Sequence, residues 1–180
     1  QTIYAKHLGS VAAPTAGLHF TPEIFAPLDA KGVRRVAVTL HVGPGTFRPV
    51  KAENIEDHEM DFEAFSVPVE TAEAVNACKA RGGRVFCVGS TTVRTLETVA
   101  AGLEEVKSKS EKVESADGRV VVSGAGASNI FIYPPYRFRV CDCMLTNFHL
   151  PQSTLLMMIS SLAGRERVLC AYAMAVQKNY

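Results

Sequence analysis

A helix, a strand and a second helix follow one another between residues 69 and 101, and this order constrains the fold more than any other feature. Apolar residues at helical spacing predict a helix over Val69 to Arg81, ended by Gly82-Gly83. The apolar run Arg84 to Val88 predicts a short strand, and a second helix is expected from Thr92 to about Ala101. This succession is typical of α/β domains whose strands pair in parallel.

The remaining elements are assigned by the same kinds of signal. Thr21-Pro22-Glu23 is a strong helix start, and that helix should reach about Ala30. Ser153 is an N-cap candidate for an apolar helix ending near Leu162. The other expected elements are strands over 1–5, 34–41, 130–133 and 138–145, and a last helix over 165–178. The fold class predicted is therefore α/β, a layered domain with a largely parallel, or mixed, central sheet flanked by helices.

The chain is most simply one domain over residues 1–180, because it shows neither repeats nor an internal linker. Residues 102–128 are charged and then rich in Gly, Ser and Ala, which predicts an exposed, mobile insertion with a short edge strand at 119–122. The net charge of +1 indicates neither a nucleic-acid nor a membrane partner. No apolar run reaches the ~18 residues of a membrane span. We expect a cytoplasmic monomer without a membrane partner.

Metal binding is not expected. The five cysteines are scattered and form no zinc-binding pattern, so buried, reduced thiols are the better interpretation; they are Cys78, Cys87, Cys141, Cys143 and Cys170. The loop histidines are widely separated in the sequence, and no HExxH pair occurs.

The loop Gly89-Ser90-Thr91-Thr92-Val93-Arg94 is a candidate anion site. It joins an apolar strand to a helix N-terminus, where unpaired N–H groups and the helix dipole favour a phosphate or a carboxylate. The equally weighted alternative is a plain helix start in which Arg94 pairs with Glu97. Ser90 lacks the GxSxG context of a serine hydrolase.

Two further loops carry a histidine beside glycines. His41, Gly43, Gly45 and Thr46 follow an expected strand, where open α/β sheets bind ligands. Parallel strands would place this loop beside the Gly89 loop. The alternative is a tight turn with a structural histidine.

The loop that contains Thr15, Gly17 and His19 leads into the helix start at Thr21. A solvated turn histidine is the alternative there, and we weight it slightly higher. The acidic run that includes Asp57, His58 and Glu63 is most simply a solvated face. A carboxylate–imidazole unit within it is also suited to act as a base.

The stretch TNFHLPQSTLLMMISSLAG joins polar loop residues directly to the apolar helix after Ser153. Thr146, Asn147 and His149 are thereby fixed to a core element, which favours a site over a connector. The basic residues fall mainly at element ends. For them we favour helix capping and surface solvation over a polyanion-binding patch.

Six strings in this order closely resemble the S-adenosylmethionine:tRNA ribosyltransferase-isomerase family of queuosine biosynthesis. They are AAPTAGLHFT, TLHVGPGTFRPV, DHEM, VGSTTVRTLE, IFIYPP and the stretch from Thr146 to Gly164. The resemblance identifies the chain as the C-terminal part of that family's catalytic domain. The family's inserted β-barrel domain is not expected within it.

The resemblance implies transfer and isomerisation of the ribosyl part of S-adenosylmethionine to 7-aminomethyl-7-deazaguanine in tRNA. The products are epoxyqueuosine, adenine and methionine. S-adenosylmethionine is a cosubstrate here, and no permanently bound cofactor is implied. A truncated, non-catalytic domain that binds a nucleotide or RNA is the alternative function.

The chemistry needs acids, bases and anion-binding donors, and the loop residues suit these tasks. The acid/base candidates are His19, His41 and His149, followed by Asp57 and His58. The substrate-binding candidates are Thr15, Gly17, Gly43, Gly45, Thr46, Gly89, Ser90, Thr91, Thr92, Arg94, Thr146 and Asn147.

Overall fold

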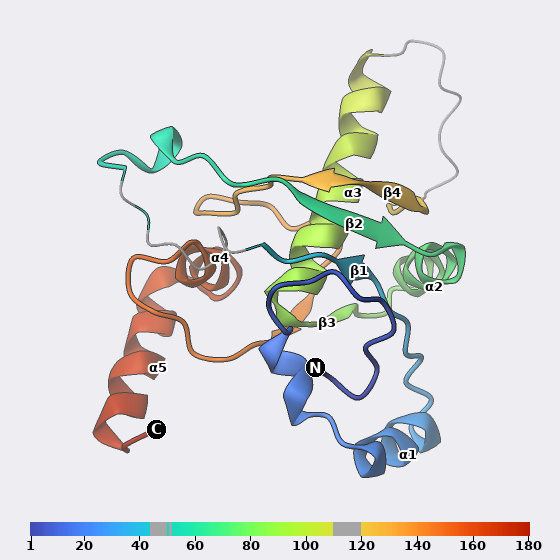
Figure 1. The fold of residues 1–180 in the computed structure, drawn as a ribbon, viewed down its shortest axis with the longest axis horizontal. Coiled ribbons are helices and arrows are strands. Elements are labelled where there is room, and N and C mark those ends of the chain that lie inside the picture. Colours follow the sequence, from blue (N-terminus) through green and yellow to red (C-terminus); the bar gives the residue numbers. More distant parts are fainter. Residues whose placement is uncertain (44–49, 51, 110–119) are drawn as a thin grey trace.

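The computed structural model describes residues 1–43, 50, 52–109 and 120–180 (Figure 1). Its helices are α1 (Pro22–Ala30), α2 (Val69–Ala80), α3 (Gly89–Lys109), α4 (Thr154–Ala163) and α5 (Arg165–Gln177), with short 3₁₀ helices η1 (Thr15–His19) and η3 (Ile55–Asp57). Its strands are β1 (Thr39–Leu40), β2 (Glu63–Val67), β3 (Phe86–Val88), β4 (Gly124–Ser128) and β5 (Cys143–Leu145). The described part of the chain is therefore an α/β structure.

The strands form two small sheets in place of one central sheet. The first has the order β1-β2-β4 with antiparallel neighbours, and the second pairs β3 with β5 in parallel. The prediction of a largely parallel sheet is thus wrong, although strands of both orientations occur. One of the two antiparallel partners of β2 is β4, which forms within a segment that the composition assigned to a mobile insertion.

Helix α3 holds the two sheets together. It contacts all five strands and η1, and in Figure 1 it passes behind β2 and β4 toward β3. Val93, Leu96 and Ala100 lie at helical spacing on its buried side, at most 3% exposed. They pack in one apolar cluster with residues from α2, both sheets and α4. This central position fixes where the first turn of α3 lies.

The predicted helices are confirmed, with small shifts at the ends of all except α3, which extends to Lys109 where about Ala101 was expected. Pro22 begins α1, and α2 ends just before Gly82-Gly83. The Ser153 hydroxyl caps α4 by accepting a hydrogen bond from Leu156 N at 3.2 Å. Helix α3 begins earlier and ends later than expected, because a glycine with φ of +84° lets it start directly at Gly89.

The strand predictions are less accurate. Residues 1–5 and 130–133 form no strand, and 34–41 and 138–145 shorten to β1 and β5. Residues 120–122, where a short edge strand was expected, form none; an edge strand lies instead at 124–128, as β4. The middle of the predicted insertion, residues 110–119, lies outside the described residues.

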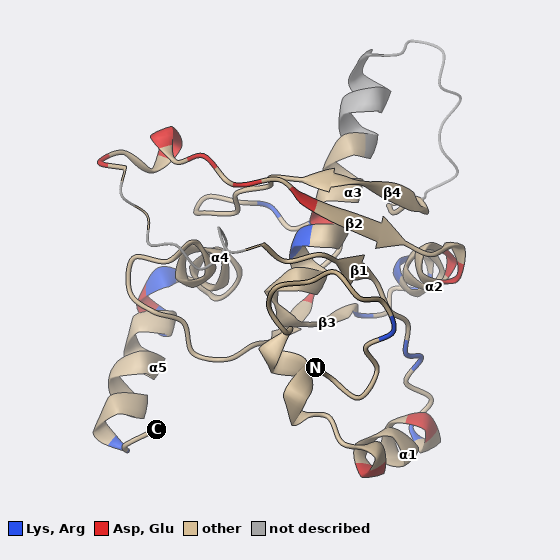
Figure 2. Ribbon diagram, viewed as in Figure 1, with Lys and Arg blue, Asp and Glu red and all other residues tan. Residues whose placement is uncertain are grey.

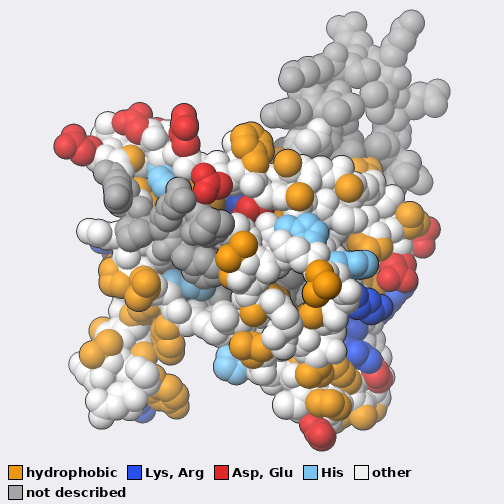
Figure 3. Space-filling view, viewed as in Figure 1, with side chains coloured by type: hydrophobic (Ala, Val, Ile, Leu, Met, Phe, Trp, Pro, Cys, Tyr) orange, Lys and Arg blue, Asp and Glu red, His pale blue; other side chains and the backbone are white. Residues whose placement is uncertain are grey.

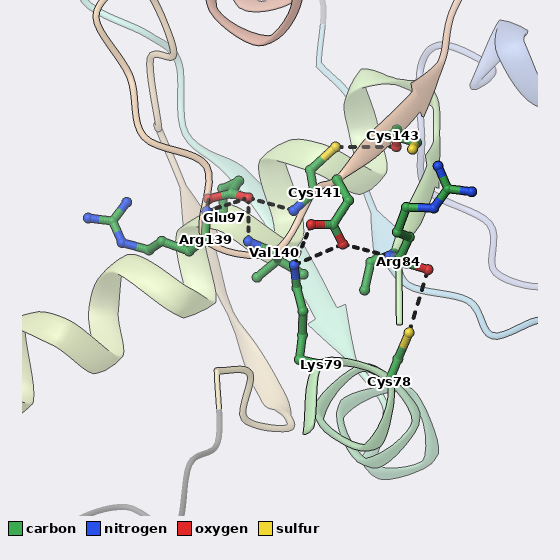
Figure 4. A network of polar contacts seen from close by, with 10 residues as sticks. Cys78, Lys79, Arg84, Glu97, Arg139, Val140, Cys141 and Cys143 are labelled. Carbon is green, nitrogen blue, oxygen red and sulfur yellow. Dashed lines mark hydrogen bonds and ion pairs between the residues drawn. The ribbon is translucent and has the colours of Figure 1, made fainter. Parts of the chain in front are cut away.

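A buried carboxylate explains why residues 136–141 are not a strand (Figure 4). Glu97 of α3 is fully buried, and it accepts hydrogen bonds from the backbone N–H groups of Arg139, Val140 and Cys141, the shortest at 2.9 Å. Tyr136 Oη also donates to it at 3.3 Å. Burial, reinforced by the Glu97 charge, raises the pKa of Tyr136 to about 12. The Glu97 carboxylate thus accepts the backbone hydrogen bonds that a neighbouring β-strand would otherwise accept.

The five cysteines are free thiols, as expected. Only Cys87 and Cys141 are buried, however, and Cys170 is exposed on α5. The hydrogen bond with the neighbouring Cys141 thiol, together with burial, raises the pKa of Cys87. The Cys87 thiol is therefore held in the protonated, unreactive form.

Candidate functional site

Three of the candidate loops meet around one cavity of about 200 Å³. Its wall consists of residues 13–16, 42, 89–91, 94, 146–150, 153 and 155. These segments are far apart in the sequence. They meet because η1 packs against α3, and because the parallel pairing of β3 with β5 brings the loops that follow these two strands together.

The first turn of α3 forms one wall of this cavity. The first N–H groups of a helix have no partner within it and carry the positive end of its dipole. Gly89 adopts a left-handed φ of +84°, and a Cβ atom there would lie 3.7 Å from Ala16 Cβ. The left-handed φ of the sharp turn from β3 therefore favours a glycine, whereas a Cβ atom would make only an ordinary contact with η1.

Arg94 reaches the same cavity from one turn further along α3. It is only 2% exposed and forms an ion pair with Glu63, which is also 2% exposed. Figure 2 shows the acidic start of β2 beside the basic band on α3. Glu63 Oε1 also accepts a hydrogen bond from Gly43 N at 2.8 Å. One carboxylate thus joins the turn after β1 to the cavity wall.

Two sequence interpretations are wrong at this point. Arg94 does not pair with Glu97, which binds the backbone of residues 139–141 instead. Glu63 does not belong to a solvated acidic face. Other acidic residues around η3 are exposed, as Figures 2 and 3 show for that part of the surface.

The loop before α4 contributes a fixed pair of polar side chains. Thr146 Oγ1 and His149 Nε2 lie 2.9 Å apart, within hydrogen-bond distance. His149 N donates to Tyr172 Oη at 2.7 Å, which ties the loop to α5. Burial lowers the pKa of His149 below its ordinary value of 6.5. His149 is therefore neutral at pH 7 and suited to accept a proton.

His19 approaches the cavity from η1. Its Nε2 donates to Asn147 Oδ1 at 2.9 Å, so this imidazole carries its proton on Nε2. His149 is thus held within the loop by Thr146 and tied to α5 by its backbone N–H, and His19 contacts the same loop through Asn147.

The lowered pKa of His149 predicts a pH-dependent stability. The unfolded chain binds a proton at this side chain near pH 6.5, before the folded protein does, so folding stability is lost as pH falls through that value. Chemical unfolding of the protein and of His149→Gln at pH 7.5 and pH 5.5 measures this effect. We expect wild type to lose more stability than the variant. An equal loss in both proteins would contradict the assignment.

Not all candidate residues line the cavity. Thr15, Gly89, Ser90, Thr91, Arg94, Thr146, Asn147 and His149 do so. His19, His41 and the Asp57–His58 pair lie outside its wall. His19 contacts Asn147 of the wall, whereas the His58 ring packs 5.1 Å from that of Phe131. Gly45 and Thr46 lie outside the described residues.

Gly17 and Thr92 contribute to the packing and the hydrogen bonding of the fold. A Cβ atom at buried Gly17 would lie 2.7 Å from Thr2 Cγ2, so close packing requires a glycine there. Thr92 Oγ1 donates to Val88 O at 2.8 Å, within the turn from β3 into α3. Gly43 acts on the cavity only through its bond to Glu63.

Two residues near the cavity were not identified from the sequence as important for the site. Glu63 alternates with Phe65 and Val67 on one side of β2, and this alternation is the signal that would have indicated its burial. Tyr172 lies 23 residues from its partner His149, and we see no sequence signal for it.

Over the described residues, no group of three His, Cys, Asp or Glu side chains is arranged to hold a metal ion. In the same part of the chain, no helix has the length and apolar character needed to cross a membrane.

The chain is similar to proteins of one family over its whole length. A family model described as queuosine biosynthesis protein matches residues 1–180. Proteins named S-adenosylmethionine:tRNA ribosyltransferase-isomerase, from Natranaerobius thermophilus and Moorella thermoacetica, are each 52% identical over 180 residues. These matches cover 100% of this chain and 48% of each relative, so the chain spans about half the length of the curated relatives it matches.

A solved structure has the same fold. It is the crystal structure of an S-adenosylmethionine tRNA ribosyltransferase from Thermotoga maritima, 39% identical, with a TM-score of 0.67. The match covers 92% of this chain and 47% of that one.

Proposed function

This chain belongs to the queuosine biosynthesis protein family, and on that premise we propose that it transfers and isomerises the ribosyl part of S-adenosylmethionine. The acceptor is 7-aminomethyl-7-deazaguanine in tRNA, and the products are epoxyqueuosine, adenine and methionine. The relatives named as ribosyltransferase-isomerases support the class of reaction. S-adenosylmethionine as the donor and tRNA as the partner are parts of the proposal.

The observation that carries the proposal is the meeting of a helix N-terminus, a buried arginine and His149 at one cavity, with His19 bonded to Asn147 of its wall. The first turn of α3 and Arg94 provide positive charge for an anionic group, either the methionine carboxylate or a tRNA phosphate. Asn147 and Thr146 provide hydrogen bonds to the ribose or to a base edge.

His149 and His19 are the proposed base and acid. The sulfonium of S-adenosylmethionine makes the C5′ protons acidic, and a neutral imidazole in the wall suits their removal. His149 is neutral at pH 7 because of its burial. His19 lies outside the cavity wall but within hydrogen-bond distance of Asn147 in it, which makes it the proposed acid for departing adenine. His41, Asp57 and His58 lie outside the wall and rank below these two.

Adenine release tests the proposed function. The protein is incubated with S-adenosylmethionine and precursor-bearing tRNA, and free adenine is measured by chromatography. We expect adenine to accumulate only when both substrates are present. Binding of S-adenosylmethionine without release of adenine would contradict catalysis by this chain and favour a non-catalytic, nucleotide-binding domain.

A further inference from the structure

We propose that Phe148 is a stacking platform for a purine-type ring at the cavity, and that Tyr172 is the positioning residue that holds it. The inference rests on the proposed function, since it specifies how one of the substrates is held there. Neither residue is among the acid/base or anion-binding candidates.

Phe148 is a large apolar side chain left in solvent at a polar site. It lines the cavity and is nevertheless 60% exposed. Its neighbours, Asn147 and His149, are both engaged, with His19 and Thr146 respectively. The backbone on each side of Phe148 is therefore tied to the cavity wall, while the ring itself remains uncovered.

Tyr172 of α5 packs against the Phe148 ring and restricts its position. The two rings meet edge to face, with centroids 5.0 Å apart and planes at 87°. Tyr172 Oη also accepts the hydrogen bond from His149 N at 2.7 Å. One side chain thus contacts the ring and the next peptide unit, so the ring is held before a ligand arrives.

The geometry leaves a flat surface for a planar ligand. An edge-to-face contact covers at most one face of the Phe148 ring, and the exposed fraction shows that much of the ring is open. Stacking of a base on such a ring contributes about 1–3 kcal/mol and tolerates different bases. The reaction offers two such rings, the adenine of S-adenosylmethionine and the 7-deazaguanine of tRNA.

Equilibrium binding of the two substrates tests the platform. The dissociation constant is measured for S-adenosylmethionine by calorimetry and for precursor-bearing tRNA by filter binding, with wild type, Phe148→Leu and Phe148→Tyr. We expect Phe148→Leu to weaken binding of one substrate by about 5- to 150-fold, the equivalent of one stacked base. Phe148→Tyr keeps the ring and should bind as wild type does.

Phe62→Leu is the matched control, because Phe62 is 71% exposed and lies outside the cavity wall. It should leave both dissociation constants unchanged. The substrate whose dissociation constant rises in Phe148→Leu is the one whose ring stacks on Phe148. Unchanged binding of both substrates by Phe148→Leu would overturn the platform alone. Binding without adenine release by wild type would overturn only the proposed catalysis, and the absence of any binding would overturn both.

A double-mutant cycle tests Tyr172. Tyr172→Phe loses the bond to His149 N but keeps the ring, whereas Tyr172→Leu loses both contacts. We expect Tyr172→Leu to weaken binding of the same substrate as Phe148→Leu, with no further loss when the two changes are combined. Additive losses would overturn the positioning role. Tyr180→Leu, at a residue 89% exposed, is the control.

Discussion

His149→Ala lowers the rate of adenine release by about 10²- to 10⁴-fold, the usual contribution of a positioned acid or base. The side chain is held at the cavity wall by Thr146, and its burial keeps it in the form that accepts protons. Alanine removes the base without filling the cavity. Single-turnover rates with saturating S-adenosylmethionine and tRNA, together with the unfolding midpoint, separate lost chemistry from lost folding.

The control for this prediction is His7→Ala, because His7 is exposed and lies outside the cavity wall. It should turn over at the wild-type rate. His19→Ala and His41→Ala extend the series, and the geometry predicts a larger loss for His19, which contacts Asn147. Near-normal turnover in all three variants His19→Ala, His41→Ala and His149→Ala would contradict the acid/base assignment.

Glu63→Gln lowers the free energy of unfolding by about 3–5 kcal/mol, the usual cost of removing one partner of a buried ion pair. The amide keeps the size of the side chain, but it removes the Glu63 charge that faces the Arg94 guanidinium in the interior. Denaturant unfolding of both proteins in the same buffer measures the difference.

Glu59→Gln is the matched control, since Glu59 is an exposed carboxylate in the same acidic run. It should change stability by less than about 0.5 kcal/mol. The double variant Glu63→Met/Arg94→Met removes both charges and should recover much of the lost stability. Equal stability of Glu63→Gln and wild type would show that the pair carries no such cost.

Local signals identified the helices well and the strands poorly. The starts of α1 and α4 follow from Thr21-Pro22 and Ser153, because capping is a property of a few adjacent residues. A strand is stable only with a partner that the sequence does not specify locally. Residues 136–141 illustrate this, because Glu97 satisfies their N–H groups where a neighbouring strand was expected.

The loops of the candidate site were identified from the sequence, but not all of the contacts between them were. The Gly89 loop, the Thr15 loop and the Thr146 loop do meet at one cavity. The turn that carries His41 does not contribute His41 to it, because β1 pairs antiparallel to β2 and is not placed beside β3.

The sequence by itself determined the α/β class, the presence of the five helices and the three loops of the cavity, since each depends on neighbouring residues or on motifs of the family. Only the tertiary structure decided that Arg94 pairs with Glu63, that Glu97 anchors the backbone of residues 139–141, and that Tyr172 supports Phe148. These contacts join residues 24 to 44 positions apart. Their partners are chosen by the packing around α3 and α5, which no local pattern encodes.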